Sequence, residues 1–201
     1  MNRTLAVSLL VIGAILVLVL LVVGWGIMTY NRIITTDEGV KAAWGQVENQ
    51  YQRRYDLVPN LVETVKGFAK QEREVLENVT NARARVGQLT ITPEVLRNPE
   101  TFARFQQAQD GLSGALSRLL AVVENYPILK SNENFLQLQS QLEGTENRIT
   151  VARNRFNETV QSYNMMIRRF PASVIAGMYG FNEMQYFKSI TGAEQVPQVK
   201  F

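Results

Sequence analysis

The sequence contains no cysteine and no histidine among its 201 residues. Without cysteine the chain can form no disulfide and no thiolate metal site, and it has no thiol nucleophile. Without histidine it lacks the usual general base at neutral pH and the commonest metal ligand. Both absences exclude the main hydrolase triads and most transition-metal centres, so we expect no metal, no cofactor and no enzymatic activity.

Clusters of one charge sign are also missing. The 21 basic residues are spread along the whole chain, and the net charge is only +3. Because no dense run of Lys or Arg is present that could follow a phosphate backbone, we expect no nucleic-acid partner. Binding to a membrane surface or to nucleic acid through the basic excess therefore ranks last among the functions that we consider.

One long apolar run is present near the N-terminus; it starts at Leu5 and ends at Met28, with Ser8 as its only polar side chain. About 20 apolar residues cross a bilayer core, whereas the apolar region of a cleaved signal peptide has roughly 7–15 residues. Trp25 and Tyr30, at the end of the run, are residue types typical of a membrane interface. We predict an uncleaved, single-pass anchor in the cell membrane, formed by residues 1–30. The flanking basic residues are nearly balanced, so both orientations stay open.

After the anchor, apolar residues recur at steps of three and four, and no alternating strand pattern competes with them. The longest such segment runs from about Asn132 to Phe170, a length typical of a long helix with coiled-coil-like packing. Prolines separate the segments, and Thr92 or Asn98 is placed to cap a helix that begins at the proline that follows it. We therefore predict an all-α fold.

The predicted architecture is an N-terminal transmembrane helix followed by an up-and-down antiparallel helical bundle of about four long helices. The bundle occupies residues 31–171. Residues 172–201 contain too many aromatic residues for a disordered tail, so we expect them to form a packed C-terminal extension.

The stretch RRYDLVPNLVETVKGFAKQE, residues 53–72, places Pro59 inside a helical pattern. Proline lacks an N–H and clashes with the carbonyl four residues earlier, so it ends a helix or kinks it. We favour a joint between two helices with its corner at Leu57 and Val58. A continuous helix through Pro59 is the alternative.

The same stretch contains four polar residues among apolar ones: Arg54, Asp56, Asn60 and Glu72. Glu72 falls on the apolar seam, where a carboxylate is costly unless it is paired, and the candidate partners are Arg54 or an arginine of another helix. One interpretation makes the four residues a small ligand site. The other, which we favour, makes them capping and register residues of the bundle, or contacts for a partner.

Several stretches of the sequence resemble the LemA family of bacteria. They are Tyr30-Asn31, Trp44, residues 53–72, NARAR at 81–85, residues 125–164, RRFP at 168–171, GFNEMQYF at 180–187 and the terminal VKF. Gln71 departs from the family, which favours a histidine there, and so does Phe156, where a tyrosine is common. The resemblance implies a single-pass membrane protein with a bundle of antiparallel helices, and it implies no particular reaction.

Two functions from different classes follow. The first is a non-enzymatic, membrane-anchored scaffold or interaction protein, whose partners are the lipid bilayer and either further copies of the chain or another membrane protein. The alternative is a membrane-tethered small-ligand sensor or carboxylate enzyme that uses the polar cluster. The alternative requires the four polar side chains to converge on an open pocket.

Overall fold

The computed structural model describes residues 3–69, 71–89 and 93–188, and all regular secondary structure in these residues is helical, as predicted. The elements are α1 (Arg3–Phe68), α2 (Arg73–Gly87), the 3-10 helix η1 (Pro93–Arg97), α3 (Pro99–Val123), α4 (Pro127–Lys130), α5 (Glu133–Arg168) and α6 (Ala172–Tyr179). The long helix predicted between Asn132 and Phe170 is confirmed as α5. Of the two predicted caps, Asn98 is confirmed, because its Oδ1 accepts hydrogen bonds from the backbone N–H groups of Glu100 and Thr101. Thr92 lies outside the described residues.

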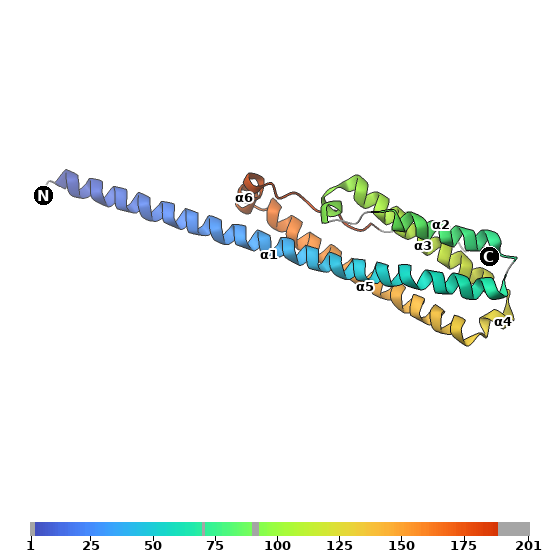
Figure 1. Ribbon diagram of the computed structural model, residues 1–201. Helices are drawn as coiled ribbons and strands as arrows, with labels where there is room; N and C mark the ends of the chain where they lie inside the picture. Colours follow the sequence, from blue (N-terminus) through green and yellow to red (C-terminus); the bar gives the residue numbers. More distant parts are fainter. Residues whose placement is uncertain (1–2, 70, 90–92, 189–201) are drawn as a thin grey trace, which may run out of the picture.

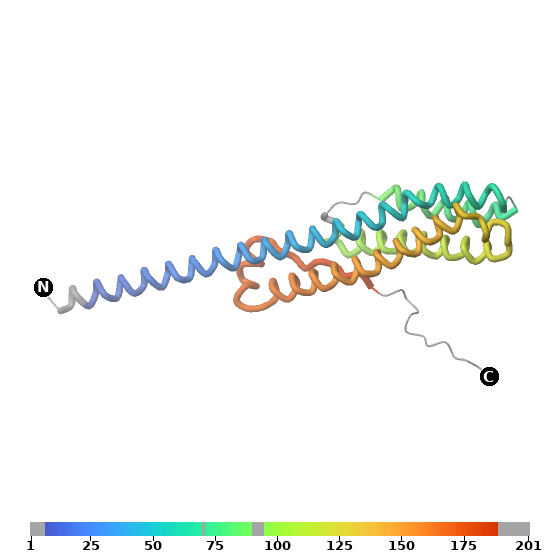
Figure 2. Tube along the Cα trace, turned by 90° about the horizontal axis from the view of Figure 1, so that it is seen from below, coloured from blue at the N-terminus to red at the C-terminus, as the bar shows by residue number. Residues whose placement is uncertain are grey.

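The helices form an up-and-down antiparallel bundle (Figure 1). The second half of α1 runs antiparallel to α5, and α2 and α3 form another antiparallel pair beside it. The first half of α1 extends beyond the bundle as a single rod, so the molecule is long and narrow (Figure 2). We call the end of the bundle near this rod the proximal end and the opposite end, near α4, the distal end.

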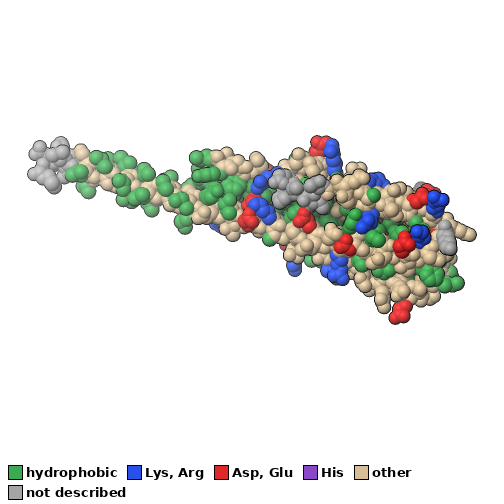
Figure 3. Space-filling view, in the orientation of Figure 1, with side chains coloured by type: hydrophobic (Ala, Val, Ile, Leu, Met, Phe, Trp, Pro, Cys, Tyr) green, Lys and Arg blue, Asp and Glu red, His purple; other side chains and the backbone are tan. Residues whose placement is uncertain are grey.

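The exposed rod carries the apolar run identified in the sequence. Its large apolar side chains, between Val7 and Met28, are all exposed, and Figure 3 shows them covering the rod without charged side chains between them. Among the described residues, α1 is one helix long and apolar enough to cross a membrane. It is therefore the candidate membrane anchor.

The predicted joint at Pro59 is wrong, because α1 continues as one helix of 66 residues to Phe68. Proline at position 59 cannot donate to the carbonyl of Tyr55, four residues earlier. That carbonyl instead accepts a hydrogen bond of 3.1 Å from Arg83 Nε on α2, and the Arg83 guanidinium lies 3.8 Å from the centre of the Tyr55 ring. Helix α1 ends only at Phe68, α2 begins at Arg73, and between them the N–H of Glu72 donates to the carbonyl of Ala69.

Two buried apolar clusters fill the bundle. The proximal cluster is rich in aromatic residues and includes Trp44, Tyr51, Phe102, Phe105, Phe156, Tyr163 and Phe187. The distal cluster is mainly aliphatic and includes Val58, Leu61, Val65, Leu76, Val79, Leu112, Leu116, Leu119 and Leu142. Phe156, one of the two departures from the family pattern, is fully buried in the proximal cluster.

The chain after α6 closes the proximal cluster. Residues 181–188, which we call the strap, run in extended form along α5 and contribute the buried side chains of Met184 and Phe187. Residues 189–201 of the predicted extension lie outside the described residues.

Candidate functional site

A buried polar layer separates the two apolar clusters. Its centre is Arg54, which is 1% exposed and lies on α1 between Tyr51 of the proximal cluster and Val58 of the distal cluster. An ionised side chain in this position requires several hydrogen-bond acceptors, because removing a charge from water is costly. The residues of the layer come from α1, α3 and α5, so the layer fixes the three helices relative to one another.

The acceptors around Arg54 come from α3 and α5. Nη1 donates to Glu146 Oε1 at 2.8 Å and to Ser113 Oγ at 2.5 Å. Nη2 donates to the side-chain oxygen of Gln109 at 2.5 Å and to its backbone carbonyl at 3.2 Å. Such a fork of charge-assisted hydrogen bonds is specific to one register of the helices. The layer is therefore suited to setting the alignment of the bundle.

The predicted polar cluster does not form. Asp56 is exposed and accepts a hydrogen bond of 2.8 Å from Gln52 Nε2, and Asn60 is exposed on the same helix. The predicted pairing of Arg54 with Glu72 is wrong, because Arg54 is paired with Glu146. The convergence on an open pocket that the sensor or enzyme hypothesis requires is absent from these four residues.

Glu72 lies in the turn after α1 and is half-buried. Its Oε1 accepts a hydrogen bond of 2.7 Å from the hydroxyl of Tyr126, which precedes α4. This hydrogen bond raises the pKa of Tyr126, because ionised tyrosine can no longer donate it. The contact joins the turn after α1 to the turn after α3 at the distal end.

A groove of about 470 Å³ between α1 and α2 approaches the polar layer, and its lining includes Tyr51 and Gln109 but not Arg54. Burial raises the pKa of Tyr51 to about 12. Among the described residues, no group of three or more Asp, Glu, His or Cys side chains lies close enough together to hold a metal ion. The hydrogen bonds of the layer join α1, α3 and α5.

The sequence did not predict the strap or the side-chain contacts that hold it. Asn164 Nδ2 donates to the carbonyl of Met184, and its Oδ1 accepts from the N–H of the same residue, both at 2.9 Å. The Asn157 side chain makes the same two hydrogen bonds with the backbone of Phe187, and the Gln106 side chain makes them with the backbone of Lys188. The available signal was Asn164 itself, since it is a polar residue on the apolar seam of α5.

A sequence model of the LemA family matches residues 43–201, a segment that begins inside α1 and excludes the exposed rod. The chain is 27% identical over 177 residues to the magnetosome protein MamQ of Magnetospirillum gryphiswaldense, covering 80% of this chain and 65% of that protein. It is 20% identical over 146 residues to protein LemA of Metamycoplasma hominis, covering 73% of this chain and 63% of that protein. The chain thus spans just under two thirds of the length of these curated relatives.

Proposed function

The chain belongs to the LemA family, and from this premise we propose that it is a non-enzymatic scaffold that presents its bundle to other proteins from the cell membrane. A single uncleaved helix, the apolar part of α1, holds it in the bilayer. Its partners are further copies of the same chain, or another membrane protein.

The main support for this proposal is that α1 is continuous. The helix that contains the anchor continues into the bundle as one of its long helices, and no linker separates the two parts. At 1.5 Å per residue, the part of α1 beyond Met28 places the distal end about 60 Å from the anchor. A rigid rod of this kind holds a binding surface at a fixed distance from the bilayer, which a flexible linker could not do.

The distal end offers a surface for a partner. A groove of about 640 Å³ lies between the last turns of α1 and the first turns of α2. Its lining includes the apolar residues Val62 and Leu76 and the polar or charged residues Glu63, Lys66, Arg73, Glu77, Thr80 and Asn81. Phe68 and Ile128, at the same end of the bundle, are 45% and 76% exposed. Exposed apolar side chains grouped at one end of a bundle are typical of a protein-binding surface.

Anchoring strengthens weak contacts between copies. Chains that share a membrane plane meet at a high effective concentration, so a contact too weak for a dimer in solution can still assemble them. We therefore expect assembly in the membrane and little association of separate micelle-bound copies.

A photo-crosslinking residue at position 128 of the full chain, reconstituted in vesicles, tests this proposal. We expect crosslinked dimers from position 128 and none from position 150, which is exposed in the middle of α5 and serves as the matched control. Replacement of Phe68 by Ser should reduce the yield at position 128. Equal crosslinking at both positions would indicate random collision, and the absence of any crosslink at position 128 would contradict assembly through the distal end.

A further inference from the structure

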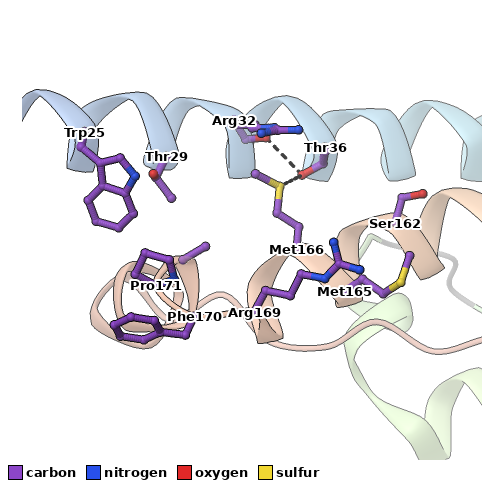
Figure 4. A pocket seen from close by; sticks show the side chains of 11 residues that line it. Trp25, Thr29, Arg32, Thr36, Ser162, Met165, Met166, Arg169, Phe170 and Pro171 are labelled. Carbon is purple, nitrogen blue, oxygen red and sulfur yellow. Dashed lines mark hydrogen bonds between the residues drawn. The ribbon is translucent and has the colours of Figure 1, made fainter.

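A pocket of about 400 Å³ lies where the bundle meets the rod, between α1 and the turn from α5 to α6 (Figure 4). Trp25 points from α1 toward the turn that contains Pro171, and Arg169 points from the end of α5 toward α1 (Figure 4). The pocket therefore has an apolar end at Trp25 and Phe170 and a polar end at Arg32 and Arg169.

The two arginines at the polar end have no protein partner. Among the described residues, neither the Arg32 nor the Arg169 side chain makes a hydrogen bond or an ion pair, and none of the residues that line the pocket is acidic. The neighbouring Arg168, by contrast, forms an ion pair in which its Nε lies 3.5 Å from Glu183 Oε1. Two unpaired guanidinium groups on one pocket, without a carboxylate, are suited to an anion, and the planar guanidinium matches a phosphate group in particular.

The position of the pocket along α1 indicates the source of that phosphate. The apolar run ends at Met28, and Arg32 follows one helical turn later, about 6 Å along the axis. Tryptophan at the end of a membrane span and arginine just beyond it are the residue types that lie at the level of the lipid headgroups. The pocket thus opens at the depth at which phospholipid phosphates are found.

Helix α6 continues the same interfacial surface. It packs against the end of the span, with the rings of Tyr30 and Tyr179 4.6 Å apart. Its outward side chains are apolar, with Val174 52% and Met178 75% exposed, and Phe170 in the preceding turn is 83% exposed. An exposed apolar face beside a membrane span is covered by lipid when the span is inserted.

We propose that the pocket between α1 and the α5–α6 turn binds one anionic phospholipid. Arg32 and Arg169 hold its phosphate, and its acyl chains follow Trp25 and Phe170 toward the hydrocarbon core. The proposal rests on the proposed membrane anchor and adds a specific lipid site to it. Because the site ties the end of α5 to the bilayer, it fixes the bundle against the membrane at a second point besides α1.

Lipid binding is measured on the full chain in detergent by native mass spectrometry, with phosphatidylglycerol as the probe. The double variant Arg32→Gln, Arg169→Gln should lose affinity for it by about tenfold or more, since each arginine near an anionic lipid contributes separately. The matched control, Arg53→Gln with Arg118→Gln, removes two exposed arginines outside the pocket and should retain wild-type affinity. Equal losses in both double variants would overturn the proposal in favour of nonspecific charge attraction.

Two further measurements test whether binding depends on the shape of the pocket as well as on its charge, and whether the ligand is a lipid or a free anion. Ser162→Trp fills the pocket while keeping both arginines, and it should also reduce binding; unchanged binding would place the lipid elsewhere. Inorganic phosphate at concentrations matching the lipid should not displace it; displacement would assign the pocket to a soluble anion.

Resistance to carbonate extraction reports the anchor alone. A wild-type chain that is extracted overturns the proposed function, whereas variants that stay inserted but lose lipid leave the anchor intact.

Discussion

The two halves of the bundle are stabilised in different ways. In the proximal half, the Trp44 ring lies between 5.2 and 6.1 Å from the rings of Phe102, Phe105, Phe156 and Phe187, and the strap closes the cluster. In the distal half, the buried side chains are mostly Val and Leu, the helices end in turns, and a groove stays open between α1 and α2. The strap thus covers the aromatic cluster of the proximal half, whereas the distal half keeps an open groove between α1 and α2.

This difference matches the position of each half relative to the anchor. Aromatic pairs add about 0.5–1.5 kcal/mol each beyond the area that they bury, so the proximal cluster holds α1 firmly where the anchor enters the bundle. The distal half is fixed mainly by aliphatic packing and by the polar layer at its base. We expect its stability to depend on that layer, and five changes test or sharpen the comparison.

The largest effect should come from Arg54, at the boundary between the halves. Arg54→Ala removes the cation from the buried layer and leaves Gln109 without its main partner. Loss of one member of a buried ionic group costs about 3–5 kcal/mol, and we expect the lower end because Glu146 is partly exposed and keeps some solvation. Urea denaturation of the full chain in detergent measures this loss.

The control for Arg54 replaces charge and acceptor together. Arg54→Met with Gln109→Leu fills the layer with apolar side chains of similar volume and should stay within about 1.5 kcal/mol of the wild type. If the double variant loses as much stability as Arg54→Ala, the polar contacts of the layer stabilise the fold in addition to setting the register of the helices.

The next effect concerns the strap, which only the proximal half has. Asn164→Ala leaves the N–H and the carbonyl of Met184 without their partner in a buried position. At about 1–3 kcal/mol for each unsatisfied group, and with partial relief as the strap detaches, we expect a loss of about 2 kcal/mol. Hydrogen exchange at the Met184 amide should accelerate. Asn154→Ala, at an exposed position on the same helix, should change neither quantity; equal exchange in both variants would contradict the role of Asn164.

The sequence predicted what depends on local pattern. The apolar run, the all-α fold, the long helix α5 and the Asn98 cap all follow from residues within a few positions of one another. The partner of Arg54 did not, because Glu146 lies 92 positions away and only the packed bundle brings it near. The path of α1 through Pro59 was missed for the same reason, since Arg83 reaches Tyr55 from 28 positions along the chain.

The Arg83 contact explains why α1 passes into the distal half without a break, and a double-mutant cycle tests it. Arg83→Ala leaves the Tyr55 carbonyl unpaired and removes the guanidinium from the Tyr55 ring, which should cost about 1–2 kcal/mol. In a Pro59→Ala background the new N–H at position 59 can donate to that carbonyl. The same Arg83 change should then cost about 1 kcal/mol less. Equal costs in both backgrounds would mean that Arg83 acts only by packing.

A smaller effect appears only in alkali and concerns Tyr51, on the proximal side of the boundary. Folding raises the pKa of Tyr51 from 10.0 to about 12 through burial, so the folded state keeps its proton after the unfolded state has lost it. This contribution is complete below pH 10 and is lost as the pH rises toward 12, by about 1.4 kcal/mol per unit. The stability difference between wild type and Tyr51→Phe should therefore shift by about 1 kcal/mol between pH 10 and 11 in favour of the variant, because the unfolded state is only half deprotonated at pH 10. An unchanged stability difference over this pH range would contradict the effect of burial on Tyr51.

The smallest effect should come from Glu72, at the tip of the distal half. A buried ion pair at this position would make Glu72→Gln strongly destabilising, but the observed partner is the neutral hydroxyl of Tyr126. Glutamine keeps a carbonyl oxygen for that hydroxyl and leaves no cation unbalanced, so the melting temperature should fall by about 2 °C or less. Glutamine keeps the hydrogen bond that raises the pKa of Tyr126 and removes only the charge of the carboxylate, so the pKa should move only part of the way back toward 10.0, and an ultraviolet titration reports it. Glu77→Gln, which removes the exposed pair with Arg73, is the control and should leave that titration unchanged.

A large fall in melting temperature for Glu72→Gln would instead show that the distal tip depends on the charge of Glu72. The distal half would then be held by more than aliphatic packing.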